Sequence, residues 1–197
     1  MSLRVEQDGR LCRIALAAPE KRNVLDAKAC AGLLCELMDA ANSPQTGAIL
    51  LEADGPVFCA GAEPDSDEFF SIGERIEKPI VAAVQGVAIS GGLALVANAH
   101  VVIAAQGSSF GFTDIRDGKW QEGIFRSLAR AIGGRRALEL GLTGRIFSTP
   151  EALAWGLVHS VAPAFELDDR ATEIGTALAG ANPGAVRDAL MRRSAGA

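Results

Sequence analysis

The sequence is poor in several residue types, and each shortage argues against a class of protein. Its 197 residues include only two histidines, and its four cysteines form no C-x-x-C pair, so neither a metal ligand set nor a redox motif is expected. No apolar run approaches the length of a membrane span, and the first residues lack the apolar core of a secretion signal. Basic residues occur at most in pairs and the net charge is −5, which disfavours nucleic acid as a partner. We therefore expect a cytoplasmic protein with reduced thiols and with no metal, membrane or nucleic-acid partner.

The composition is that of a globular protein with a substantial core. Hydrophobic residues make up 49% of the chain and charged residues 22%, as in folded domains. Strand and helix patterns alternate at first, and helices dominate later, which favours an α/β fold. We expect a single domain over residues 1–197, with a core over about 1–145 and a helical C-terminal region over about 146–197.

Periodicity and turn residues predict the main elements. A hairpin is expected over Val5–Ala18, and Asp26 is a typical N-cap for a helix that ends near Asn42. The acidic segment Glu63–Glu77 is expected to hold one short helix. Further strands are expected at 48–51, up to Phe58, and at 79–84, 100–104 and 158–161, and further helices at 93–99, 124–132, 135–142, 150–155, 167–179 and 183–193.

Two glycine-containing turns offer backbone donors for an anion. Gly86–Gly92 follows a buried strand and opens a helix, whose first N–H groups have no partner within the helix. It matches neither the dinucleotide fingerprint nor a phosphate loop. Phe58–Ala62 supplies a second set of amides after another strand. Two such turns could direct two N–H groups at one oxygen, which is the geometry of an oxyanion hole.

Around these turns the sequence resembles the crotonase superfamily, the enoyl-CoA hydratases and isomerases. Ala18-Pro-Glu-Lys-Arg-Asn-Val-Leu25 is similar to the family segment R-P-x-x-R-N-A-L, and Val57–Glu63 is similar to A-F-C-A-G-A-D. Lys78–Gly92 is similar to K-P-V-I-A-A-V-x-G-x-A-x-G-G-G. The later landmarks follow in the family order: Phe110-Gly111, Ile132-Gly133, Leu142–Arg145 and Glu151–Val158. The resemblance covers about residues 3–192, and the ordered set is far more specific than any one motif.

The resemblance implies a fold, a ligand and a site. The expected fold is the crotonase spiral of ββα units with a helical C-terminal part, here shortened, assembled as a trimer or hexamer. The expected ligand is an acyl-CoA thioester, so coenzyme A is part of the substrate and no separate cofactor is implied. The oxyanion hole is expected from the backbone N–H groups of Ala62 and Gly91. The residues expected to border coenzyme A are Lys21, Arg22, Val24, Ala60 and Gly61, of which the first two also fit a solvated surface pair.

The carboxylates bear on which reaction the resemblance implies. Family hydratases use two glutamates, and the first of these positions is Ala94 here, which has no ionisable group. The second position matches Asp114, and a third family position matches Glu122. Because hydration needs two groups and moving a proton along an acyl chain needs only one, this set favours double-bond isomerisation. Asp114 also fits a turn residue, and Glu122 an exposed acid at a helix N-terminus.

Other interpretations stay open at this point. The protein could be an enoyl-CoA hydratase, or catalyse another crotonase reaction such as hydrolysis or decarboxylation. It could also bind CoA esters without turning them over. The order Ser90, Asp114, His159 fits a serine hydrolase triad, although Ser90 stands where the crotonase pattern has a glycine. His100 and His159 also fit ordinary strand-edge residues.

Overall fold

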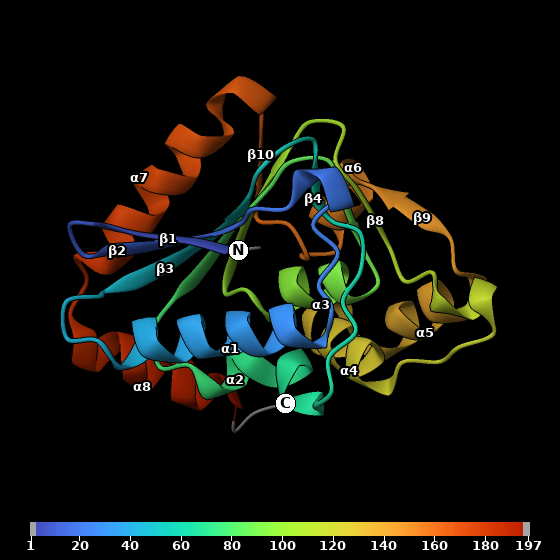
Figure 1. Cartoon of the computed structure of the whole chain (residues 1–197), viewed down its shortest axis with the longest axis horizontal. Coiled ribbons are helices and arrows are strands. Elements are labelled where there is room, and N and C mark those ends of the chain that lie inside the picture. Colours follow the sequence, from blue (N-terminus) through green and yellow to red (C-terminus); the bar gives the residue numbers. More distant parts are fainter. Residues whose placement is uncertain (1–2, 195–197) are drawn as a thin grey trace.

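The computed structural model describes residues 3–194, in which strands and helices alternate along the chain (Figure 1). The strands are β1 (Leu3–Asp8), β2 (Leu11–Leu16), β3 (Ala48–Ala53), β4 (Val57–Cys59), β5 (Ile80–Val84), β6 (Val87–Ile89), β7 (Val101–Ala105), β8 (Ser109–Gly111), β9 (Ile146–Ser148) and β10 (Ser160–Ala162). The α-helices are α1 (Ala27–Asn42), α2 (Ile72–Arg75), α3 (Gly91–Asn98), α4 (Glu122–Ile132), α5 (Gly134–Thr143), α6 (Thr149–Ala154), α7 (Leu167–Ala179) and α8 (Pro183–Ser194). Short 3-10 helices are η1 (Pro19–Lys21), η2 (Asp67–Ser71), η3 (Asp114–Asp117) and η4 (Ala164–Glu166).

A six-stranded sheet has the order β1-β2-β3-β5-β7-β10. β1 and β2 are antiparallel and form the expected hairpin, whereas the other neighbours are parallel. Every residue of β5 is buried, as is usual for a central strand of a parallel sheet that is covered on both faces. The apolar run Ile80–Val84 therefore places β5 in the middle of the sheet.

Helices cover both faces of this sheet. α7 lies along one face, where Leu167 and Ala171 join a core cluster with Leu50 and Val81 (Figure 1). α1 and α3 lie on the opposite face, in a larger core (Figure 1). Close packing on both faces thus stabilises the sheet. The larger of the two cores also includes residues of the second sheet.

The second sheet has four strands in the order β4-β6-β8-β9. Three of its strands directly follow strands of the first sheet, because β4 follows β3, β6 follows β5 and β8 follows β7. This recurring pair of strands confirms the α/β fold of ββα units that the sequence predicted. The sequence indicated β4 but not β6, β8 or β9, since each has three residues and is too short for a periodic pattern.

The predicted helices are confirmed, with small shifts at their ends. α1 begins directly after Asp26, whose carboxylate accepts a hydrogen bond from Ala29 N at 2.8 Å. α3 begins at Gly91, two residues earlier than expected. The segment 63–77 holds η2 and α2 instead of one short helix. Within residues 3–194, no helix combines the length and apolar character that crossing a membrane requires.

Candidate functional site

A buried asparagine shapes the loop before α1. Asn23 is 1% exposed and has a φ of 54°, in the left-handed region that asparagine tolerates better than most residues. Its side-chain oxygen accepts a hydrogen bond from Ala18 N at 2.9 Å. Its Nδ2 donates to the carbonyl oxygens of Asp54 and Val57 at 2.9 and 2.8 Å. One amide therefore ties this loop to the end of β3 and the start of β4.

The same loop lies along the turn that follows β4. Ala60 N donates to Arg22 O at 3.1 Å, and Leu25 N donates to Gly61 O at 3.0 Å. A further bond from Glu63 N to Leu25 O, at 2.9 Å, extends this pairing. The structure thus brings together the two segments that the sequence expected to border coenzyme A.

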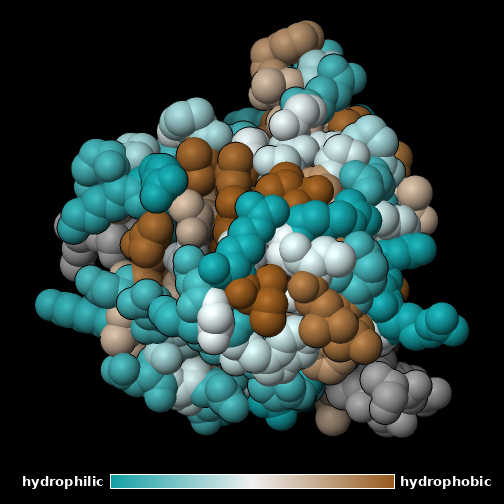
Figure 2. All heavy atoms as spheres, turned by 90° about the vertical axis from the view of Figure 1, so that its right-hand side faces the viewer, coloured by the Kyte–Doolittle hydropathy of each residue, from teal (hydrophilic) through white to brown (hydrophobic). Residues whose placement is uncertain are grey.

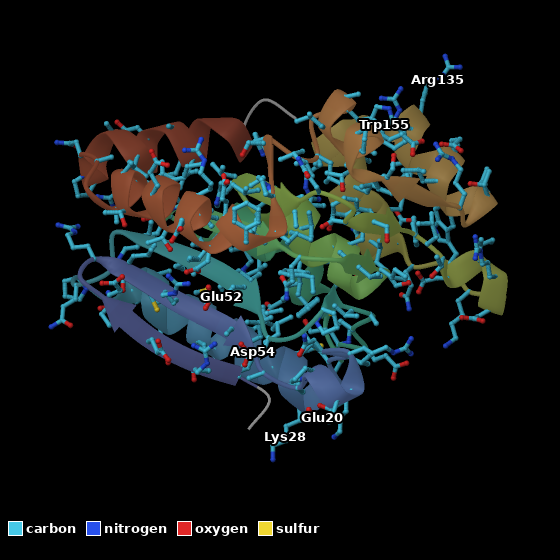
Figure 3. The ribbon with its side chains drawn as sticks, turned by 90° about the horizontal axis from the view of Figure 1, so that it is seen from above. Glu20, Lys28, Glu52, Asp54, Arg135 and Trp155 are labelled. Atoms are coloured by element: carbon cyan, nitrogen blue, oxygen red, sulfur yellow. The ribbon has the colours of Figure 1, made fainter. Side chains whose placement is uncertain are left out.

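The side chains that this loop presents face solvent. Lys21 and Arg22 are exposed, and Val24 is 38% exposed. Figure 3 shows Glu20 and Lys28 projecting outward from the same part of the molecule. An anionic ligand could therefore meet several cations here, and contact of Lys21 or Arg22 with coenzyme A stays a prediction.

Ala62 and Gly91 lie in direct contact. A Cβ placed on Gly91 would stand 2.4 Å from the Cβ of Ala62 and 2.6 Å from its backbone nitrogen, so only glycine permits this approach. In the part of the chain that the structure describes, neither backbone N–H donates to a protein acceptor. Gly91 is also the first residue of α3, where the helix dipole favours negative charge. Two available donors thus lie side by side, as the expected oxyanion hole requires.

Helix α3 is held tightly against β4. A Cβ on Gly92 would stand 2.2 Å from the carbonyl oxygen of Cys59, so this second glycine is also required by packing. All residues of α3 are buried, and Ala94 is 1% exposed. The position where family hydratases are expected to have a glutamate is therefore a small apolar side chain within the core.

Ser90 joins β6 to α3 in a strained conformation. Its φ of 53° and ψ of −116° belong to a region that residues other than glycine rarely adopt. Ser90 N donates to Gly111 O at 2.8 Å, and Ser90 O accepts from Ala94 N at 3.1 Å, so both neighbours fix this geometry. The Ser90 hydroxyl does not cap the helix and lies 3.2 Å from the Thr113 hydroxyl.

Asp114 follows Thr113 and begins η3. Its Oδ2 is buried and makes no hydrogen bond, the one such side-chain atom among the residues described. Leaving a buried polar atom without a partner costs about 1–3 kcal/mol, so this oxygen needs an explanation. Thr113, the residue before Asp114, contacts Ser90, which in turn precedes the oxyanion candidate Gly91.

Glu122 has a different environment. It is exposed at the start of α4, and its Oε2 accepts a hydrogen bond from Trp120 Nε1 at 3.0 Å. The Trp120 ring packs against Phe112 and Phe125, with ring centroids 5.4 Å apart in each pair. Glu122 thus resembles an acid at a helix N-terminus that orients a tryptophan, and its catalytic role stays a prediction.

The structure does not assemble the triad of Ser90, Asp114 and His159. His159 Nδ1 accepts a hydrogen bond from Val102 N at 3.0 Å, and the residue lines a cavity with Val96 near the C-terminal end of α3. Ser90 precedes the N-terminal end of the same eight-residue helix, roughly 12 Å away along its axis. His100 Nδ1 similarly accepts from Ile80 N, at 2.9 Å. The triad hypothesis was wrong because it used only the order of the three residues in the chain, which does not show how far apart they lie.

Across residues 3–194, no three His, Cys, Asp or Glu side chains gather as metal ligands would. All four cysteines are free thiols, and Cys35 is the exposed one. Burial raises the pKa of Cys30 to about 12 and that of Cys59 to about 11, so both thiols stay protonated at neutral pH.

Sequence reasoning gave no role to Asn23 or Thr113. Asn23 was part of a motif, but nothing in the sequence indicated its left-handed backbone or its three hydrogen bonds. Thr113 matters through its contact with Ser90, which joins residues 23 positions apart. Ser90 did carry a signal, because a serine at a glycine position implies either a glycine-like backbone or a use for the hydroxyl.

Comparison with known proteins relates the sequence to one family. The family model for enoyl-CoA hydratase/isomerase matches residues 64–195. A mevalonyl-coenzyme A hydratase of Aspergillus fumigatus is 32% identical over 193 residues, covering 88% of this chain and 71% of the relative. A probable enoyl-CoA hydratase of Mycobacterium tuberculosis is 31% identical and covers 93% of this chain and 77% of the relative. The chain spans 63% of another relative, the mitochondrial enoyl-CoA hydratase domain-containing protein 3 of Rattus norvegicus, at 30% identity.

Solved structures give the same relationship. The crystal structure of the human enoyl coenzyme A hydratase domain-containing protein 3 superposes with a TM-score of 0.89 at 26% identity, covering 96% of this chain and 82% of that one. An enoyl-CoA hydratase from Mycobacterium smegmatis superposes with a TM-score of 0.87 at 30% identity, covering 98% and 87%.

Proposed function

The chain belongs to the enoyl-CoA hydratase/isomerase family, and we propose that it binds an acyl-CoA thioester and stabilises the enolate of that thioester. The observation that carries this proposal is the contact between Ala62 and Gly91, whose N–H groups have no protein acceptor among the residues described. A thioester oxygen between them would gain negative charge as the α-proton leaves. Each donor aimed at such an oxygen is worth about 3–4 kcal/mol in the transition state.

Asp114 is the proposed base. The observation behind this assignment is its buried Oδ2, which has no hydrogen-bond partner among the residues described. In the isomerisation of a 3-enoyl-CoA, the carboxylate removes the α-proton, the oxyanion hole holds the enolate oxygen, and the proton returns at the γ-carbon. One carboxylate can serve both transfers, which suits a site where Ala94 replaces a second acid.

Hydration is the second candidate, favoured by the names of the relatives. The A. fumigatus and M. tuberculosis relatives are both named as hydratases. Hydration would need a group to position water in addition to Asp114, and Glu122 is the remaining acid at a matching position. A protein that binds CoA esters without turnover is the outcome if neither reaction occurs.

The test compares wild type, Asp114→Asn and Glu122→Gln on a 3-enoyl-CoA and on crotonyl-CoA. We expect isomerisation to exceed hydration in the wild type, and Asp114→Asn to lower kcat by about 100-fold with little change in KM. Asp117→Asn is the matched control, because Asp117 is an exposed acid on the same short helix. Fast crotonyl-CoA hydration would replace the isomerase proposal, and full activity in both variants would show that neither acid is the base.

Two wider statements accompany this proposal. Coenzyme A enters as part of the substrate, and no separate cofactor is invoked. A cytoplasmic location stays a prediction, since relatives from Rattus norvegicus and Dictyostelium discoideum are named as mitochondrial.

A further inference from the structure

Ser90 has a backbone conformation that suits glycine better than serine. Glycine adopts a positive φ without steric strain, whereas a side chain at φ 53° and ψ −116° is held there against strain. Such strain concentrates where a side chain has to be presented at a fixed angle. The enolate chemistry proposed above uses the Gly91 N–H and gives the Ser90 hydroxyl no task.

The hydroxyl of Ser90 also does not cap helix α3. A serine that precedes a helix normally accepts a hydrogen bond from an N–H of the first turn. Ser90 makes no such bond, and its Oγ lies 3.2 Å from Thr113 Oγ1 on the neighbouring segment. The residue is partly exposed, and its hydroxyl contact with Thr113 is partly buried.

The position of Ser90 relative to the paired N–H donors suits a nucleophile. In hydrolases with a nucleophilic serine on a strained turn between a strand and a helix, the next residue supplies one oxyanion donor and another loop supplies the second. Here β6 leads into Ser90 and α3 follows it, Gly91 is the next residue, and Ala62 belongs to another loop. The Ser90 hydroxyl thus belongs to the residue directly before one of the two expected oxyanion donors.

We propose that Ser90 is an acyl acceptor, which would give the protein a thioesterase activity. This inference rests on the proposed binding of an acyl-CoA thioester in the oxyanion hole. The Ser90 oxygen attacks the carbonyl carbon, a C–O bond forms, the C–S bond breaks, and the hydroxyl proton ends on the sulfur of coenzyme A. Water then attacks the ester, the Ser90 oxygen leaves and regains a proton, and the free carboxylic acid departs.

Asp114 is the proton acceptor for both steps. Its Oδ2 is buried without a partner, and the preceding residue, Thr113, holds the Ser90 hydroxyl. Neither histidine serves, because the rings of His100 and His159 bond backbone groups near the opposite end of α3. Since a thioester is more reactive toward a nucleophile than the oxygen ester formed on Ser90, we expect hydrolysis to be the slower step and an acyl-enzyme to accumulate.

The experiment uses butyryl-CoA, a saturated thioester that can be enolised or transferred but not hydrated. The protein carries Cys35→Ser, so that its exposed thiol cannot take the acyl group. After mixing and acid quench, the intact mass and peptide map should show one butyryl group on Ser90. Ser90→Ala and Ser90→Gly should lack this adduct and release coenzyme A at least about tenfold more slowly, whereas Ser109→Ala, on β8, should retain both.

Exchange of the α-proton in deuterated water, measured on the same protein, separates this inference from the proposed function. Exchange without an acyl group on Ser90 would overturn the acyl-transfer inference and leave the enolate proposal standing. An acyl group found on another residue would overturn it equally. Neither exchange nor adduct would overturn both proposals. Ser90→Gly suits the positive φ of this position, and an unchanged free energy of unfolding in that variant separates loss of the adduct from misfolding.

Discussion

Asn23 and Asp114 are both polar side chains set among buried groups, and they differ in what they bond. The Asn23 amide has three backbone partners, so its burial is compensated and its role is to hold the loop. Asp114 Oδ2 has none, so its burial is unfavourable unless a ligand bonds it. Asn23 therefore supports the site, and Asp114 is the candidate for proton transfer in it.

Replacing Asn23 with alanine should lower the free energy of unfolding by about 3 kcal/mol, because the backbone groups it bonds would lose their partner. Urea unfolding followed by circular dichroism measures this change. Asn42→Ala is the control, since Asn42 is exposed at the end of α1 and should shift stability by no more than about 0.5 kcal/mol. Equal stability of the two variants would show that the Asn23 bonds do not hold the loop.

At the scale of elements, the start of α3 is placed by close contacts that exclude side chains. Gly91 lies against Ala62, and Gly92 lies against the Cys59 carbonyl. Because these two residues have no Cβ, the N-terminus of α3 can lie against the loop that carries the Ala62 N–H.

Gly91→Ala should reduce kcat/KM by about 100-fold or more, because the added Cβ would displace Ala62 and misplace an oxyanion donor. Activity and unfolding free energy are measured together. Gly134→Ala is the matched control, since a Cβ on this first residue of α5 meets nothing within 4 Å. It should leave activity unchanged, whereas wild-type activity in Gly91→Ala would remove this contact from the site.

The start of α6 supports a prediction on pH. Glu151 accepts hydrogen bonds from Ser148 N at 2.9 Å and from Arg145 at 2.8 Å, and these bonds lower its pKa from 4.5 to about 2. A carboxyl group whose pKa is lower in the folded state stabilises that state above its unfolded pKa and loses this contribution as pH falls through its folded pKa. The free energy of unfolding should therefore fall between about pH 4.5 and 2, and Glu151→Gln should flatten that fall. An unchanged pH slope in the variant would contradict this assignment.

For the molecule as a whole, one side carries several exposed large apolar side chains. Figure 2 shows hydrophobic patches between charged residues on the side that carries α5 and β9 in Figure 1. Leu142 is 60% exposed and Leu138 is 43% exposed on α5, with Ile146 on β9 and Leu153 on α6 also exposed. Several large apolar side chains exposed on one side are a feature of protein–protein interfaces.

We predict that this side is buried in a homo-oligomer, a trimer or a hexamer. Light scattering at micromolar concentration should give a mass well above that of one 20.4 kDa chain. Leu142→Glu should dissociate the assembly, whereas Val5→Lys should not, although Val5 is 43% exposed on β1, on the other side of the molecule. A wild-type monomer would contradict the prediction.

The family, the long elements and the two turns of the site could be predicted from the amino-acid sequence alone. These follow from local chemistry: Asp26 caps a helix with its own side chain, Ile80–Val84 is apolar throughout, and glycines mark the places where a backbone must come close. Each of these signals depends on a few neighbouring residues, so it can be recognised without knowing any contact between distant parts of the chain.

Contacts between residues far apart in the chain became known only from the fold. β6 and β8 exist because strands far apart in the chain pair with them, and their pairing brings Ser90 beside Thr113. The same folding separates Ser90 from His159 along α3 and leaves Asp114 Oδ2 without a partner. Burial and long-range pairing depend on the whole chain, which is why the sequence placed these residues in order but could not place them in space.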